Sequence, residues 1–147
     1  MKVTNLKLLA TSDKDLRVIA AHLQDSIVLP KDIANLKKNR IFLIQLNRFM
    51  WEDIEKGVFR KNKRVRTILK FDNVTSVLSK NINMKDEKQF LDFLTIESNL
   101  LNDKSYEIKL IFSGDAVIKV IAEVIDVTLD DQGSPWESKT APKHNFL

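Results

Sequence analysis

The sequence predicts an α+β domain: a mostly antiparallel sheet of about seven strands, curled into a sandwich or half-barrel, and one helix. Three observations support this fold class. Several segments alternate apolar and polar residues, the connections between them are short, and a single segment near residues 13–25 carries an apolar stripe at helical spacing. Strands joined by short turns pair as antiparallel hairpins, because parallel strands need long crossovers. We expect one domain over residues 1–133 and an extended, mostly polar tail over residues 134–147.

The helix is predicted from its N-terminal signal and its apolar spacing. Ser12 is a residue type that caps helices, and Asp15, three positions later, suits the answering position of a short capping box. Apolar residues then recur three and four positions apart, which places them on one face, at Leu16, Ile19, Ala20 and Leu23. The helix is expected to end near Ser26, where β-branched residues begin and Pro30 follows.

The first half of the sheet is expected from apolar segments that follow the helix. Residues 27–29 predict a short strand that Pro30 confines to an edge or a bulge, because proline cannot donate a ladder hydrogen bond. Residues 41–46 are apolar on both alternating faces, which is typical of a central strand, and residues 47–51 extend it.

The second half is predicted from alternation and turn signals. Strands are expected at residues 64–71, 74–78, 90–97, 106–112 and 116–128. In the first of these, one face is expected to carry Val65, Thr67, Leu69 and Phe71. Residues 90–97 fit helical spacing as well as alternation, and we favour the strand. Residues 99–105 are expected to form a loop, residues 113–115 a hairpin turn, and residues 116–128 one long or bent strand. Glycine occurs only 3 times, so asparagine, which tolerates left-handed backbone, is expected to occupy many turns.

Composition excludes several classes of protein. Apolar residues make up 44% and charged residues 30% of the chain, which fits a globular protein rather than a disordered one. The chain contains no cysteine, which excludes disulfides, thiolate catalysis, iron–sulfur clusters and cysteine-ligated zinc. Only 2 histidines are present, and the 3 glycines lie too far apart for a nucleotide-binding loop. We therefore expect neither a metal site nor a cofactor.

The location is predicted from the apolar runs of the chain. The N-terminal apolar stretch is too short for a signal peptide, and no run is long enough to span a bilayer. We expect a cytoplasmic protein without membrane contact.

A basic cluster stands out in the charge pattern. Residues 1–70 carry a net charge of +9 and residues 71–147 a net charge of −5. The basic residues are densest in one short stretch, at Arg60, Lys61, Lys63, Arg64 and Arg66. Such a cluster is typical either of a solvated loop that protects a strand edge, which we favour, or of a phosphate- or nucleic-acid-binding patch.

A second candidate site is the end of the predicted central strand, where Arg48 and Trp51 lie close in sequence. An arginine beside an aromatic ring clamps a ligand in some proteins and packs structurally in others, and we favour packing here. His22, Asp25 and Ser26 lie within one helical turn, but no nucleophile elbow accompanies them. We therefore predict no catalytic residue.

Five segments follow one another in a recognisable order: HLQD (residues 22–25), LNRFMWE (46–52), LKFDNV (69–74), LIFSGDAVIKV (110–120) and DQGSPW (131–136). In these segments the chain resembles an uncharacterised bacterial family that is catalogued as a domain of unknown function. The resemblance covers about residues 6–137, and LNRFMWE and DQGSPW are its most specific markers. It implies a small bacterial cytoplasmic protein and carries over no catalytic or binding residue.

Together these observations favour a non-catalytic interaction domain that uses a sheet face or edge to bind another protein or a second copy of itself. The alternative is a nucleic-acid-binding module that works through the basic cluster at residues 60–66. A small-molecule-binding or hydrolytic protein with its pocket near Arg48 and Trp51 ranks third.

Overall fold

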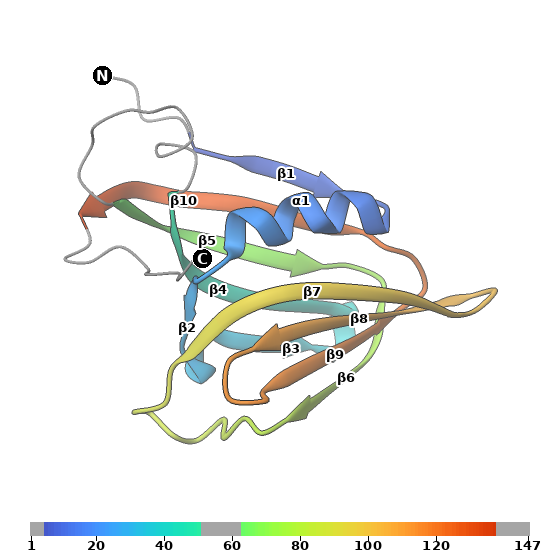
Figure 1. The fold of residues 1–147 in the computed structure, drawn as a ribbon. Helices are drawn as coiled ribbons and strands as arrows, with labels where there is room; N and C mark the ends of the chain where they lie inside the picture. The colour runs from blue at the N-terminus through green and yellow to red at the C-terminus, as the bar shows by residue number, and fades with distance from the viewer. Residues whose placement is uncertain (1–4, 51–62, 138–147) are drawn as a thin grey trace, which may run out of the picture.

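The computed structural model of the chain describes residues 5–50 and 63–137, and it is dominated by antiparallel strands (Figure 1). In chain order the elements are β1 (Lys7–Ala10), α1 (Asp13–Leu23), β2 (Ile27–Val28), the 3₁₀ helix η1 (Pro30–Asp32), β3 (Ile33–Leu36), the 3₁₀ helix η2 (Lys37–Asn39), β4 (Ile41–Phe49), β5 (Lys63–Phe71), β6 (Val74–Lys80), β7 (Leu91–Asn102), β8 (Ser105–Phe112), β9 (Val117–Ala122) and β10 (Val127–Glu137). The predicted fold class is confirmed, with 10 strands within these described residues in place of about seven.

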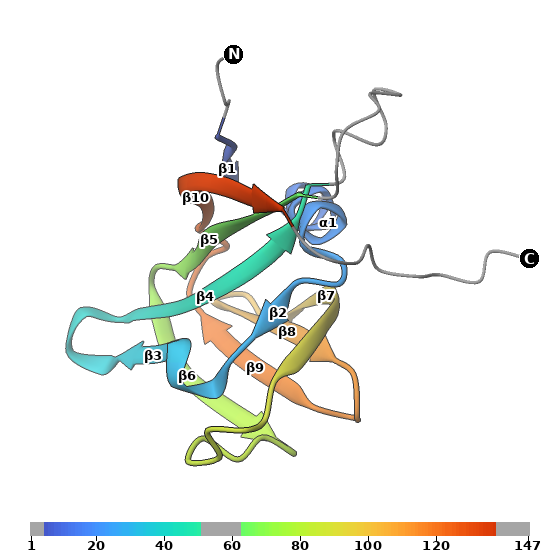
Figure 2. The ribbon, with the colours of Figure 1, turned by 90° about the vertical axis from the view of Figure 1, so that its left-hand side faces the viewer.

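All strands belong to one sheet that curls over on itself. The order is β1-β10-β5-β4-β2-β7-β8-β9-β6, with β3 paired to β4, and every pairing is antiparallel. Figure 2 shows that β4 and β5 lie on one side of the molecule and β8 and β9 on the other. The short β2 joins these halves, because Ile27 pairs with Asn47 of β4 and with Asp92 of β7. The sheet is curled but not closed.

The helix forms where its sequence predicts. The Ser12 side chain accepts a hydrogen bond of 3.2 Å from the Asp15 amide, as an N-cap residue does. The Asp15 carboxylate accepts a bond of 3.0 Å from the Thr11 amide, so the capping box is displaced by one residue. The apolar stripe is buried, at Leu16, Ile19, Ala20 and Leu23. The helix lies between β1 and β7 (Figure 1).

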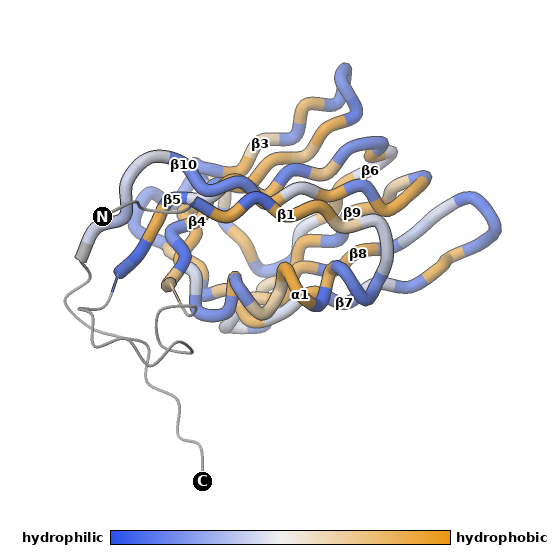
Figure 3. The backbone as a smooth tube through the Cα atoms, turned by 90° about the horizontal axis from the view of Figure 1, so that it is seen from above, coloured by the Kyte–Doolittle hydropathy of each residue, from blue (hydrophilic) through white to orange (hydrophobic). Residues whose placement is uncertain are grey.

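The core fills the space inside the curled sheet. Alternate residues of β4 and β5 are buried in it, and Figure 3 shows orange, apolar residues along strands of both halves of the sheet. The inward face that the sequence predicts for β5 is confirmed, since Val65, Thr67, Leu69 and Phe71 are all buried. Aromatic pairs cross between neighbouring strands, with ring centroids 5.9 Å apart for Phe42 and Phe71 and 5.8 Å apart for Phe93 and Phe112.

Of the two positions expected for residues 27–29, an edge or a bulge, the edge is wrong. This strand does not lie at an edge; β2 lies between β4 and β7 and connects the two halves of the sheet. Pro30 begins the 3₁₀ helix η1, with Leu29 between it and the strand, so it needs no ladder hydrogen bond. Because β2 has only 2 residues, Pro30 lies outside the paired part of the strand, although the strand itself is inside the sheet.

The predicted loop over residues 99–105 is also wrong for most of its length. β7 runs on to Asn102 and β8 begins at Ser105, so the two strands form a long hairpin. Polar residues occur in this stretch because it projects beyond the core, where neither face is buried. Strand pairing therefore continues where apolar alternation has ended.

Residues 116–128 form two strands and not the one long or bent strand expected. β9 ends at Ala122 and pairs with β6 and β8, whereas β10 begins at Val127 and pairs with β1 and β5. The chain crosses between the halves of the sheet through the turn that separates them. β10 then continues to Glu137, so residues 134–137 belong to the sheet and not to an extended tail.

Candidate functional site

The basic cluster at residues 60–66 lies only partly within the described residues. Arg60 and Lys61 fall outside them, whereas Lys63, Arg64 and Arg66 lie on β5. The Arg66 side chain is exposed, while Lys63 and Arg64 are half-buried. The three described side chains therefore differ in their access to solvent.

Arg64 is engaged with neighbouring strands. Its guanidinium donates hydrogen bonds to the carbonyl oxygens of Asp25, at 3.2 Å, and Asn47, at 3.1 Å. It also lies over the ring of Phe49, 5.8 Å from the centroid. Burial lowers the pKa of Arg64 from its ordinary value, and the carboxylates of Asp25 and Asp92 act in the opposite direction. Arg64 thus helps to hold β5, β4 and the end of α1 together.

Arg48 is the largest fully buried side chain of the described residues, and it forms an ion pair with Asp131 of β10. The guanidinium donates from Nε to Oδ1 at 2.8 Å and from its terminal nitrogen to Oδ2 at 2.6 Å. The side chains of Arg48 and Asp131 are 0% and 1% exposed, respectively. Trp51, the other residue of the predicted pocket, lies outside the described residues. The structure therefore places Arg48 in a buried ion pair that links β4 to β10.

The carboxylate of Asp131 also anchors the segment before β1. Asp131 Oδ2 accepts a bond of 2.9 Å from the Leu6 amide, and the Asp131 amide donates to the Leu6 carbonyl at 3.0 Å. Burial by itself would raise the pKa of Asp131, but hydrogen bonds from Arg48 and Leu6, with the nearby Thr67 hydroxyl, outweigh it. The pKa of Asp131 therefore lies below its ordinary value, and the carboxylate is ionised at neutral pH.

The helix histidine has a structural partner. His22 Nδ1 lies 3.0 Å from the Val18 carbonyl, one helical turn earlier. Within residues 5–50 and 63–137, no group of three or more histidine, aspartate or glutamate side chains could hold a metal ion. No helix of this described part is long and apolar enough to cross a membrane.

In Figure 2, β3 and β6 lie near each other on the side where the curled sheet fails to close. A groove lies between them, lined by residues of both strands. Two adjoining hollows, of about 220 and 180 Å³, share Asn35 and Val77 in their lining. The floor is apolar, because the buried Phe42 and Ile118 lie at the base of the second hollow. We call this feature the β3–β6 groove; its two hollows are lined by Ile33, Asn35, Lys37, Arg40, Phe42, Val74, Thr75, Ser76, Val77, Ser79, Met84 and Ile118.

Both walls of the groove are strand edges. In the described residues, β3 pairs only with β4, and β6 pairs only with β9. Each strand therefore presents one row of backbone N–H and C=O groups that no neighbouring strand covers. At one end the walls are joined by a single hydrogen bond of 2.9 Å, from the Val74 amide to the Arg40 carbonyl. Beside the groove, Leu36 of β3 and Leu78 of β6 are 41% and 59% exposed.

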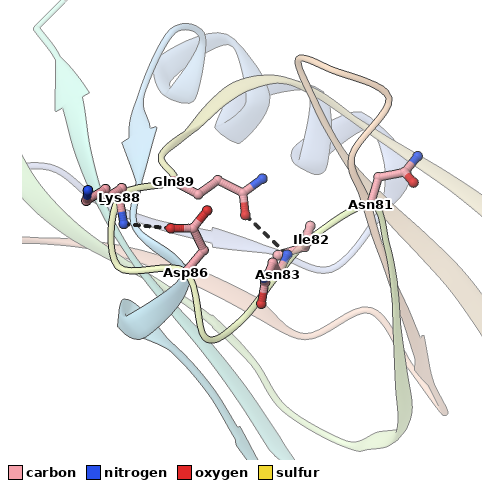
Figure 4. Close-up of a pocket in the computed structure, with 6 residues that line it drawn as sticks. All are labelled: Asn81, Ile82, Asn83, Asp86, Lys88 and Gln89. Carbon is pink, nitrogen blue, oxygen red and sulfur yellow. Dashed lines mark hydrogen bonds between the residues drawn. The ribbon is translucent and has the colours of Figure 1, made fainter.

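A wider hollow of about 530 Å³ lies along the loop that precedes β7, and Figure 4 shows the six residues that line it. Several of its polar groups bond to one another: the Asn83 amide donates to Gln89 Oε1 at 3.1 Å, and the Lys88 amide donates to Asp86 Oδ1 at 2.9 Å. The Asn81 side chain donates instead to the Asp115 carbonyl, at 2.9 Å, in the turn between β8 and β9. These bonds account for the loop's shape. The hollow is broadly open to solvent.

Sequence reasoning misses the groove and the buried ion pair for different reasons. The groove depends on the curvature of the sheet, which no local pattern encodes. The ion pair joins residues 83 positions apart, and its sequence signal is indirect: Arg48 belongs to the LNRFMWE marker and Asp131 to the DQGSPW marker. The two most specific segments of the family resemblance therefore meet inside the fold.

Comparison with known proteins gives one finding. A family model described as "Protein of unknown function (DUF2948)" matches residues 6–144. The match contains all five segments that carry the resemblance. Comparison of the chain with curated proteins and with solved structures finds no match.

Proposed function

This chain belongs to the DUF2948 family of proteins of unknown function, and we propose that it is a non-catalytic interaction domain that binds a partner protein through the β3–β6 groove. The observation that carries this proposal is the open sheet, in which the edge strands β3 and β6 flank an apolar-floored groove. We propose a cytoplasmic location, with which the lack of cysteine agrees.

The edges of β3 and β6 support binding of an extended chain. Soluble proteins commonly protect exposed edges by covering them, by shortening them or by placing charges on them. Here β6 extends over 7 residues, and only its last residue, Lys80, is charged. A partner strand that enters the groove can use the free backbone groups for hydrogen bonds and the hollows for its side chains.

The nucleic-acid alternative receives less support from the described residues. Arg64 already donates to two backbone carbonyls and stacks on Phe49, so its guanidinium serves the fold. Arg66 is the exposed member of the three described basic residues. The small-molecule alternative is weakened in the same way, because Arg48 is bound to Asp131 and shielded from solvent.

Affinity capture with matched variants tests the proposed function. Ser79 lines the groove and is exposed, so Ser79→Trp fills the second hollow at little cost to the core. Asn99 is an exposed residue of β7 far along the hairpin, and Asn99→Trp is the matched control. We expect the wild-type chain and Asn99→Trp to retain the same protein from an extract of the native cells, and Ser79→Trp to lose it. Equal retention by all three chains, or by none, contradicts the proposal.

A further inference from the structure

We propose that the β3–β6 groove takes an extended peptide segment of a partner protein that places apolar side chains at alternate positions and an acidic side chain at one end. This inference rests on the proposed function and names the chemistry of the partner. Three features of the groove carry it: the two strand edges, the apolar hollow and the charge at one end.

The two strand edges require an extended conformation of the bound peptide, which we call the guest. β3 has 4 residues and β6 has 7, and each has one side without a strand neighbour in the described residues. A guest strand beside either edge completes the ladder and narrows the gap in the curled sheet. A helix cannot use these edges, because its backbone groups bond internally.

The second hollow selects apolar side chains. Its volume is about 180 Å³, and its apolar lining comes from five separate parts of the fold, at Ile33, Phe42, Val77, Met84 and Ile118. Because successive side chains of a strand point to opposite faces, only alternate residues of the guest can enter this hollow. The polar atoms beside it belong to Asn35 and Ser79, at the rim.

The first hollow adds a charge preference. Among the described residues, the only charged ones that line either hollow are Lys37 and Arg40, and both line the first. Arg40 is paired at 2.6 Å with Glu123, whereas Lys37 forms no ion pair within the described part of the chain. An acidic side chain at this end of the guest would pair with Lys37, which is exposed at the lip of the groove.

The same charge argues against a second copy of this chain as the occupant. Among the edge strands, β1 (KLLA), β3 (IANL) and β6 (VTSVLSK) contain no acidic residue. If two copies of the chain paired through these edge strands, no acidic side chain of the added strand would face Lys37. A partner protein with an acidic strand therefore fits the groove better than self-association does.

Selection from a phage-displayed library of random peptides, with the full-length wild-type chain as target, tests the inference. We expect the recovered peptides to alternate apolar and polar residues and to carry aspartate or glutamate near one end. Their affinity is then measured by fluorescence anisotropy on the wild type and on two pairs of variants. Ser79→Trp is compared with Asn99→Trp, and Lys37→Glu with Lys38→Glu, because Lys38 is exposed on the same 3₁₀ helix but does not line the groove.

The two pairs separate this inference from the proposed function. We expect Ser79→Trp and Lys37→Glu each to weaken binding about tenfold or more, and both controls to stay within about twofold of the wild type. One result would overturn the acidic partner while leaving the groove as a binding site: the peptides bind Ser79→Trp more weakly, but they lack acidic residues or bind Lys37→Glu as well as the wild type. If the peptides bind Ser79→Trp as tightly as the wild type, or if the selection recovers no peptide, both this inference and the proposed function are overturned. Thermal unfolding of each variant verifies that it folds.

Discussion

At the scale of single residues, the ion pair between Arg48 and Asp131 is a buried link between strands that lie far apart in the sequence. It is removed from water, and its two hydrogen bonds of 2.8 and 2.6 Å form a bidentate contact. One carboxylate thereby holds β4, β10 and the amide of Leu6 in place. Such a pair fixes the register of distant strands, although its net contribution to stability is small compared with the effect of removing one partner.

Removal of one partner of the ion pair is therefore expected to lower the free energy of unfolding strongly. We expect Asp131→Asn to lower the free energy of unfolding by about 3–5 kcal/mol, because it leaves the charge of Arg48 buried without a counter-ion. The double variant Arg48→Met with Asp131→Leu is expected to recover much of this loss, since it removes both charges. Urea unfolding followed by circular dichroism measures both changes. A double variant less stable than Asp131→Asn would show that the ion pair itself stabilises the fold.

The same carboxylate predicts an acid dependence of stability. Its folded pKa lies below the unfolded value of about 4, so the unfolded state binds more protons when the pH falls through that region. The stability that Asp131 contributes is present above the unfolded pKa and is lost as the pH falls through the lower folded pKa. As the pH falls below about 5 and through the unfolded pKa, the wild type should lose stability more steeply than the double variant. Parallel slopes in unfolding experiments at several pH values would contradict this assignment.

The ion pair shows where residue-level prediction from the sequence ends. The sequence marks Arg48 as an arginine at the end of an apolar strand, and the family markers single out its segment and that of Asp131. The contact itself depends on the register of β5 against both β4 and β10, which brings residues 83 positions apart together. No spacing rule within a segment encodes that register.

At the scale of elements, local signals predict the helix and several turns. Ser12 caps the helix as expected, and Asn73 and Asn81 adopt left-handed backbone at the ends of β5 and β6, with φ of 58° and 61°. Gly114 has a φ of 71° in the predicted hairpin turn. These features depend on a few neighbouring residues, so the sequence is sufficient for them.

Elements that depend on distant pairing are predicted less well. β2 has 2 residues, and it lies inside the sheet because strands on both sides pair with it. That pairing leaves no signal in its own sequence, which resembles the sequence of an edge strand. β9 and β10 are each apolar and close in sequence, which makes them look like one strand, although they pair in different halves of the sheet. β1 gives no clear signal, because it is short and only its last residue is buried.

The helix cap supplies a prediction at this scale. Ser12→Ala is expected to lower the free energy of unfolding by about 1 kcal/mol, because the Asp15 amide then loses its acceptor. Lys14→Ala, at an exposed position of the same turn, serves as the control and is expected to change stability little. Chemical denaturation measures both. An equal effect of the two substitutions would exclude a capping role for Ser12.

At the scale of the whole molecule, the open sheet predicts a gradient of protection. β4 and β8 have strand neighbours on both sides, whereas β3 and β6 have a neighbour on one side only in the described residues. In the free protein, amides of β4 and β8 are expected to exchange with deuterium more slowly than those of β3 and β6. Uniform protection across these four strands would show that the edges are covered.

Amide exchange in the presence of an acidic peptide recovered from the library tests the strand-binding groove most directly. If the peptide adds a strand between β3 and β6, exchange slows in those two strands and is unchanged in β1, the remaining edge. Slower exchange in β1 alone, or unchanged exchange in both β3 and β6 at saturating peptide, would contradict a binding site in the open side of the sheet.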